Sequence, residues 1–199
     1  MGGSFLLTSF LVNPKKISAQ ESKFKFSTVP SDTYYEEQWY LEKIKADKAW
    51  EKTRKSPDVV IAVIDSGVQV DHLDLQDNIW KNSDEIPNNG KDDDKNGFID
   101  DVSGWDFVEN VPDPSPKIKE NYQEDGILHG TAVAGVAAAV GNNGTGITGV
   151  TWHTKIMPLR VLDHKGEGKS SSVIRAIDYA IENGADIINF SFVGLQSGP

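Results

Sequence analysis

The feature that most constrains the fold is a continuous apolar run at residues 59–64, VVIAVI. A run without polar alternation is typical of a strand that is buried on both faces, as the strands of parallel sheets are. Such a sheet needs helices on its faces, so the run predicts an α/β fold. The run ends at Asp65-Ser66-Gly67, which is a turn signal.

The rest of the chain alternates further strands with helices. Strands are predicted at residues 155–162 and 186–190, and helices at residues 129–140 and 171–182. This alternation predicts a doubly wound parallel sheet flanked by helices. Ligands of such sheets bind beyond the carboxyl ends of the strands. Asp65, at the end of the first strand, and His129, at the start of a helix, therefore stand at functional positions.

Charge and cysteine content exclude several classes of function. The chain of 199 residues has 30 acidic and 20 basic residues, which gives a net charge of −10, and it has no cysteine. The negative balance argues against nucleic-acid binding, since phosphate contacts need clustered Lys and Arg. Disulfides, thiolate zinc sites and a Cys nucleophile are excluded. No apolar run approaches the ~20 residues of a membrane span.

The amino-terminal residues are predicted to lie outside the folded domain. Residues 5–12 form a short apolar stretch, so residues 1–29 are interpreted as a signal-like segment followed by a polar linker. No basic residue precedes the apolar stretch, and a disordered or wrongly assigned start is the alternative. The folded domain is expected to span residues 30–199.

Three stretches together resemble the subtilisin-like serine proteases, the subtilase family, and in particular its thermitase-like branch. They are the segment around Asp65 (VIDSGV), the segment that begins at His129 (HGTAVAG) and residues 187–191 (IINFS), in this order. The family uses an Asp-His-Ser triad, in which a base activates a serine hydroxyl that attacks a peptide carbonyl. The resemblance implies that Asp65 orients the imidazole and that His129 is the general base.

The family's nucleophile segment, which is similar to Gly-Thr-Ser-Met-Ala, and its oxyanion Asn have no counterpart in residues 1–199. The resemblance therefore implies the N-terminal part of a catalytic domain, truncated before the last strands and the nucleophile helix. We expect a serine-type endopeptidase fragment that is inactive alone, from a secreted parent that cleaves proteins or peptides. An inhibitory propeptide is usual in the family and is not expected within this chain. The alternatives are a noncatalytic peptide-binding module and a calcium-binding pseudoenzyme domain.

Two backbone edges are expected to bind the substrate. In the family an extended peptide pairs with both edges as an added strand. The resemblance places these edges at Gly166, Glu167 and Gly168, and at Ser191, Phe192 and Val193. Val193 replaces an expected glycine, which is expected to narrow the pocket for the residue before the scissile bond.

An acidic loop insertion at about residues 80–104 predicts a calcium site. Residues 71–101 hold ten acidic and three basic residues, so this segment carries −7 of the net −10. Residues 92–101 are similar to the front of an EF-hand loop, in which alternate carboxylates converge on calcium around a glycine turn. The candidate ligands are Asp92, Asp94, Asn96, the carbonyl of Phe98, and Asp100 or Asp101. A solvated turn loop is the alternative.

A second calcium site rests on the resemblance to the thermitase-like branch alone. The matching positions are Asp32, Asp74, Asn143 and Thr145, with the backbone carbonyls of Val140 and Ile147. A third and weaker group is Asp106, Glu109 and Asp113, in which Val111 stands where an acid is expected. Structural calcium would tie long loops to the core in a chain without disulfides.

Overall fold

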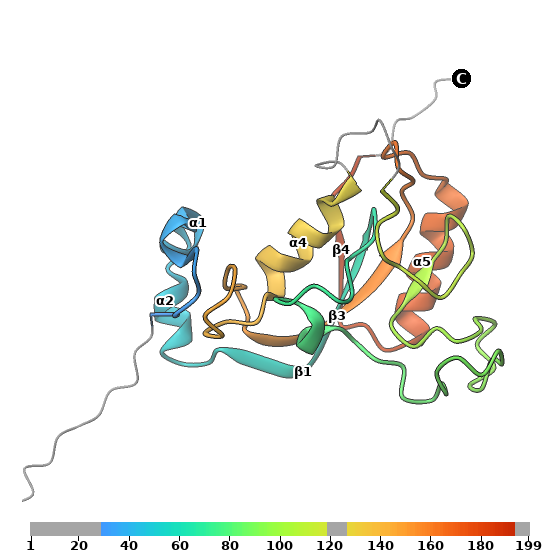
Figure 1. The fold of residues 1–199 in the computed structure, drawn as a ribbon, viewed down its shortest axis with the longest axis horizontal. Coiled ribbons are helices and arrows are strands. Elements are labelled where there is room, and N and C mark those ends of the chain that lie inside the picture. The colour runs from blue at the N-terminus through green and yellow to red at the C-terminus, as the bar shows by residue number, and fades with distance from the viewer. Residues whose placement is uncertain (1–28, 119–126, 194–199) are drawn as a thin grey trace, which may run out of the picture.

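The protein is described by a computed structural model that covers residues 29–118 and 127–193. The predicted signal-like segment lies outside these residues, apart from Val29. Four parallel strands form one sheet in the order β2-β3-β1-β4. The strands are β1 (Lys55–Asp65), β2 (Trp105–Asp106), β3 (His153–Arg160) and β4 (Ile187–Phe190). Figure 1 shows the strands at the centre of the molecule.

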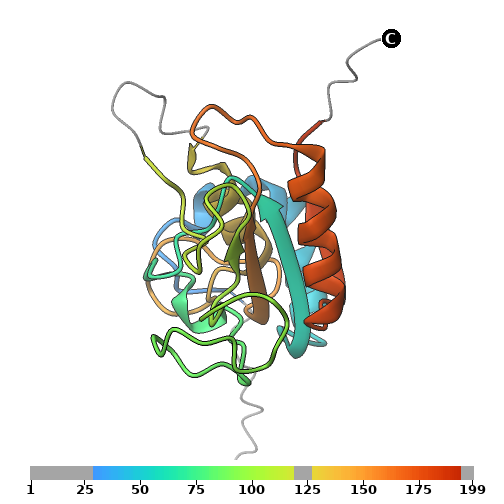
Figure 2. The same cartoon turned by 90° about the vertical axis from the view of Figure 1, so that its right-hand side faces the viewer.

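One helix covers each face of the sheet. The helix α4 (His129–Ala138) packs its buried Ala134 and Ala138 against Val63 of β1. The helix α5 (Ser170–Glu182) packs Tyr179 on the other face, against Ile64 and its neighbours. Figure 2 shows α5 running alongside the sheet. The α/β prediction is confirmed, because the apolar run of β1 is buried from both sides.

Two short helices of the N-terminal region, α1 (Trp39–Lys43) and α2 (Ala46–Trp50), lie beside the start of β1 (Figure 1). The ring of Trp50 meets that of Trp152 edge to face, with ring centroids 5.2 Å apart. The Trp50 indole also donates a hydrogen bond to the carbonyl of Val150. These contacts anchor the N-terminal region to the loop before β3. The 3₁₀ turns η1 (Tyr35–Glu37) and η2 (Gln76–Asn78) complete the elements of the part of the chain that the structure describes.

Most of the observed boundaries differ from the predicted ones, by one to four residues. β1 begins at Lys55, four residues before its predicted start at residue 59. β3 begins at His153, two residues before its predicted start at residue 155. The strand β2 was not predicted, because its two residues lie between long loops and carry no strand pattern. Among the helices of the described residues, none is long and apolar enough to cross a membrane.

Candidate active site

Asp65 and His129 meet at the carboxyl end of the sheet. Asp65 is the last residue of β1 and is completely buried, whereas His129 is the first residue of α4 and has its side chain 45% exposed. The imidazole Nδ1 lies 2.9 Å from Oδ1 and 3.0 Å from Oδ2 of Asp65. An ionised carboxylate only accepts hydrogen bonds, so Nδ1 is the donor to Asp65 and Nε2 is the ring nitrogen left without a contact to Asp65. Two residues 64 positions apart therefore form the pair that the sequence predicted.

Ser66 fixes the approach of the helix to the strand. Its hydroxyl donates a hydrogen bond to the carbonyl of Ile127 and accepts one from the backbone N–H of Gly130, so it clamps the start of α4. The backbone N–H of Ser66 also donates to Oδ1 of Asp65 at 2.7 Å. The hydroxyl of Thr131 accepts a hydrogen bond from the backbone N–H of Gln69. The sequence indicated Ser66 only as part of a turn signal and did not predict this supporting role.

Gly130 allows the close contact between α4 and the turn after β1. A Cβ at this position would lie 2.4 Å from the carbonyl oxygen of Gly67 and 3.0 Å from the Cβ of Asp65. The Gly67 oxygen is a backbone atom and the Asp65 Cβ is bonded directly to the backbone, so neither has much room to move. The glycine that follows His129 is therefore required by packing.

We expect Gly130→Ala to destabilise the chain by about 1–3 kcal/mol, because the added methyl group overpacks the contact with Gly67. Gly135→Ala in the same helix is the matched control, since its Cβ would meet only the Ile147 side chain at 3.4 Å. Alanine is favoured over glycine in helices by up to ~1 kcal/mol, so the control should be neutral or stabilising. Urea unfolding measures both values. Equal stability of Gly130→Ala and the parent chain would contradict the packing argument.

The two predicted substrate edges lie on loops that follow β3 and β4. Gly168 pairs in antiparallel fashion with Leu162, and the carbonyl of Glu167 accepts a hydrogen bond from the N–H of Asp163. Gly166 has a φ of +75°, which favours glycine there. A pocket of about 270 Å³ lies beside this edge, lined among others by Phe107, Val108 and Lys169. The first edge is thus ordered backbone next to a cavity.

The second predicted edge follows β4 directly. The Ser191 hydroxyl accepts a hydrogen bond from the Asn189 side-chain amide. The Phe192 ring meets that of Phe190 edge to face, and Val193 is 85% exposed. The side chain of Val193 is therefore free to contact a ligand at this end of the sheet.

The residues of the predicted second calcium site converge. Asp32 and Asp74 are both buried, and Asp74 accepts hydrogen bonds from the Asn143 side-chain amide and the backbone N–H of Ile147. Burial raises the pKa of Asp32, although backbone hydrogen bonds oppose this, and the charge of Asp74 raises it further. Oδ1 of Asp32 is buried and has no hydrogen-bond partner. An unsatisfied carboxylate oxygen beside a second carboxylate fits a bound cation.

The remaining predicted residues of that site lie in the loop at residues 140–147, which contacts Asp32 and Asp74. The loop at residues 140–147 is tied to both residues, because the N–H of Asn142 donates to the Asp32 carboxylate and the N–H of Val140 donates to the backbone carbonyl of Asp74. Within the loop, the N–H of Thr145 donates to the side-chain oxygen of Asn143. All the donors available here are oxygens, which suits a hard cation such as Ca²⁺.

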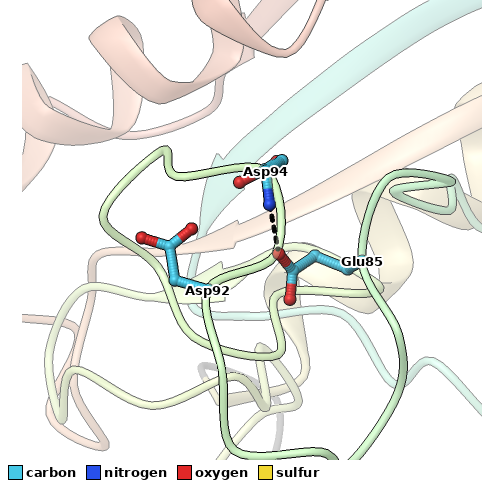
Figure 3. Close-up of side chains that lie close together, drawn as sticks. All are labelled: Glu85, Asp92 and Asp94. Carbon is cyan, nitrogen blue, oxygen red and sulfur yellow. Dashed lines mark hydrogen bonds between the residues drawn. The ribbon is translucent and has the colours of Figure 1, made fainter.

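The acidic loop gathers three carboxylates, from Glu85, Asp92 and Asp94, as Figure 3 shows. One oxygen of each lies within 4.8 Å of the others. Glu85 is only 5% exposed, and its Oε1 accepts hydrogen bonds from the backbone N–H groups of Asp93 and Asp94. Sequence reasoning missed Glu85, because it lies outside the EF-hand-like pattern and reaches the cluster through the closure of the loop.

The other predicted carboxylate ligands of the acidic loop have hydrogen-bond partners of their own. The Asp100 carboxylate accepts hydrogen bonds from the backbone N–H groups of Asn89 and Gly90, and the backbone N–H of Asp100 donates to Oε2 of Glu85. Asp101, offered as the alternative ligand, is buried and accepts hydrogen bonds from Tyr179 and from the side-chain amides of Asn82 and Asn96. Burial raises the pKa of Asp101 against these hydrogen bonds. Asp101 therefore joins the acidic loop to α5.

Asn96 and Phe98 hold the acidic loop together. The Asn96 side chain donates to Asp94, and its oxygen accepts from the N–H of Phe98. The ring of Phe98 packs edge to face on Tyr179 at 4.9 Å. The loop is therefore anchored to the core by a polar network and by an aromatic contact.

The third predicted group of calcium ligands, Asp106, Glu109 and Asp113, forms ion pairs with basic side chains. Oδ2 of Asp106 accepts a hydrogen bond from Nη1 of Arg160 at 2.6 Å, and Oδ1 accepts two backbone hydrogen bonds, from Val108 and Glu109. Asp113 pairs with Lys117. These carboxylates already have partners, so the structure gives no support for a cation at this position.

Comparison with known proteins identifies relatives. Residues 56–197 match Peptidase_S8, described as the subtilase family. Subtilisin-like protease 1 of Plasmodium vivax is 40% identical over 165 residues, which cover 81% of this chain and 25% of that protein. Thermitase of Thermoactinomyces vulgaris is 36% identical over 166 residues, which cover 83% of this chain and 48% of that protein. The chain thus spans about a quarter to a half of the length of these relatives.

Solved structures agree with the fold. A protease of Pseudoalteromonas arctica superposes with a TM-score of 0.62 and 29% identity, over 82% of this chain and 50% of that one. The serine protease of Aeromonas sobria, in complex with its chaperone, gives a TM-score of 0.60 at 20% identity, over 85% of this chain and 26% of that one. The second likeness concerns the fold alone.

Proposed function

Because this chain belongs to the subtilase family, we propose that residues 30–199 form the N-terminal part of the catalytic domain of a serine endopeptidase. The observation that carries the proposal is the hydrogen-bonded pair of Asp65 and His129 at the carboxyl end of β1. A buried carboxylate that orients a half-exposed imidazole is the arrangement of a general base and its supporting residue.

The geometry supports a separate role for each member of the pair. His129 would accept the proton of a serine hydroxyl through Nε2 and later deliver it to the leaving amine. Asp65 would hold the tautomer with the proton on Nδ1 and stabilise the imidazolium ion that forms. Ser66 is not available as the nucleophile, because its hydroxyl is bonded to Ile127 and Gly130. The nucleophile and the oxyanion donors would come from the longer protein.

The experiment that tests the proposed function compares two forms of the protein on casein. We expect the longer protein, extended through the nucleophile segment, to cleave casein, and residues 1–199 to show no turnover above background. The reason is that a base without a nucleophile forms no acyl-enzyme. Casein turnover by residues 1–199, or a longer protein that remains inactive when correctly folded, would contradict the proposal.

We further propose that Ca²⁺ stabilises two loops. Asp32, Asp74 and the carbonyl-rich loop at residues 140–147 would hold one ion, and the buried unpartnered Oδ1 of Asp32 supports this site. Glu85, Asp92 and Asp94 would hold the other ion in the acidic loop. The ions are proposed as structural, since both sites lie in loops that connect elements of the fold.

The substrates are proposed to be extended polypeptides that pair with the edges at residues 166–168 and 191–193. The pocket beside Gly168 is lined by both Glu167 and Lys169, so a substrate side chain there would meet charges of both signs. We propose an extracellular site of action, supported by the signal-like residues 5–12. An inhibitory propeptide would belong to the longer protein.

A further inference from the structure

The helix α4, which carries His129 at its first position, is capped from another element of the fold. Among the described residues around its start, Leu128 makes no side-chain hydrogen bond at the cap, and the first turn contains no acidic residue. The backbone N–H of Ala132 donates to the carbonyl of Leu128, one turn earlier. The N–H groups of the residues before Ala132 lie in the first turn, where a helix offers no acceptor of its own. An acceptor for them has to come from outside the helix.

Ser66, which directly follows β1, supplies such an acceptor. Its hydroxyl accepts a hydrogen bond from the backbone N–H of Gly130 at 3.1 Å and donates one to the carbonyl of Ile127 at 2.8 Å. Ser66 is only 2% exposed, so removal of this hydroxyl would leave a buried N–H group and a buried carbonyl without these partners. One hydroxyl thus binds the backbone on both sides of His129.

The backbone of Ser66 contacts the other member of the pair. Its N–H donates to Oδ1 of Asp65 at 2.7 Å, and the same oxygen lies 2.9 Å from Nδ1 of His129. Ser66 therefore binds the carboxylate through its backbone and the residues that flank the histidine through its hydroxyl. A hydrogen bond weakens steeply as its angle departs from linearity. The Asp65–His129 hydrogen bond thus depends on how the end of β1 and the start of α4 meet.

We propose that Ser66 is a positioning residue, whose hydroxyl sets the start of α4 against the end of β1 so that Nδ1 of His129 faces the Asp65 carboxylate. This inference rests on the proposed function, in which the position of His129 decides proton transfer. The His129 side chain is 45% exposed, so the protein does not enclose the ring on all sides. A catalytic group has to be held within about 0.5 Å of its productive position. The backbone on either side of His129, fixed by Ser66, provides this restraint.

A second hydrogen bond of the same helical turn provides a matched control. The hydroxyl of Thr131 accepts from the backbone N–H of Gln69 at 3.0 Å, which ties the first turn of α4 to the segment after β1. Thr131→Val removes this hydroxyl at nearly constant size and leaves the contacts of Ser66 in place. If only the stability of the helix start mattered, Thr131→Val and Ser66→Ala would affect His129 in the same way.

The first test is an NMR measurement, in residues 1–199, of the Nδ1 proton of His129, which resonates far downfield when a carboxylate holds it. We expect the parent chain and Thr131→Val to show this resonance. Ser66→Ala should lose it, because the proton of a misplaced imidazole exchanges with water. Ser66→Thr keeps a hydroxyl and should retain the resonance, whereas Ser66→Val, which has the size of threonine without the hydroxyl, should lose it. Urea unfolding establishes that each variant is folded.

The outcomes that contradict the inference are specific. A resonance that persists in folded Ser66→Ala, that Thr131→Val loses equally, or that is absent from the parent chain would overturn it. If Ser66→Ala does not fold, the pair of equal size, Ser66→Thr and Ser66→Val, decides in its place. If only the variants with a hydroxyl at position 66 fold, Ser66 is required by the fold and not by the position of His129, and the inference is wrong.

Kinetics of the longer protein separate positioning from substrate binding. Ser66→Ala should lower kcat by about 10²-fold with KM within about twofold, since a small misplacement of a catalytic group has an effect of this size. Ser66→Thr should recover most of this loss, and Thr131→Val should stay near the parent value. A rise in KM with unchanged kcat would overturn the inference. The NMR readout needs no nucleophile, so it fails or succeeds separately from the proposed protease function, whose failure would appear as inactivity of the longer protein.

Discussion

His129→Ala in the longer protein is expected to lower kcat by about 10⁶-fold, a magnitude known from subtilisin itself. The physical reason is the loss of the proposed acceptor for the serine proton, whose place Asp65 cannot take because it is buried behind the imidazole. KM should change little, because the substrate edges at residues 166–168 and 191–193 do not include His129. Steady-state kinetics on a short peptide ester measures both constants.

The control for this substitution is His153→Ala, which removes an exposed histidine at the start of β3, the end opposite the site. It should leave kcat within about twofold. Asp65→Asn should lower kcat by about 10⁴-fold, a loss between those of the two other variants. This magnitude is known from other serine proteases including subtilisin, and it arises because the amide no longer fixes the tautomer of the imidazole. A loss below 100-fold for His129→Ala would remove His129 from the role of general base.

The fold was largely predictable because its strongest pattern is local. The apolar run of β1 and the alternation of strands and helices lie in contiguous segments, and each is buried in the way the pattern predicts. β2 could not be found in this way, since its two residues become a strand only by pairing with Leu159 and Arg160. Register and pairing of such short strands are decided by tertiary contacts.

The candidate site was predictable to the extent that its residues lie in short motifs. Asp65 and His129 each begin or end an element, and both appear where the sequence places them. Ser66 and Glu85 act through partners that are distant in sequence, at residues 127 and 92–94. The carboxylate of Asp100, a predicted calcium ligand, accepts hydrogen bonds from the backbone of Asn89 and Gly90, which the EF-hand pattern does not indicate. Loop closure, which no local pattern encodes, decides these contacts.

Removal of calcium is expected to lower the melting temperature by about 5–10 °C for each site that was saturated. An ion at 100 times its Kd contributes about 2.7 kcal/mol to the folded state, and a domain of this size loses 2–4 °C for each kcal/mol. Differential scanning calorimetry in calcium and in chelator measures the difference, with magnesium as the control for ionic strength. Equal melting in both buffers would contradict both proposed sites.

Asp32→Asn tests the first calcium site separately from the second, because its effect on the melting temperature should depend on whether calcium is present. In calcium the variant should melt below the parent chain, because a ligand carboxylate is lost. In chelator it should melt at the same temperature or higher, since the substitution removes the repulsion between Asp32 and Asp74 and the burial of an unpaired charge. Glu85→Gln should reduce the rise in melting temperature that calcium causes, by the part of that rise that comes from the site in the acidic loop. If Asp32→Asn lowered the melting temperature equally in both buffers, Asp32 would be a packing residue and the unpartnered Oδ1 would have no bearing on calcium.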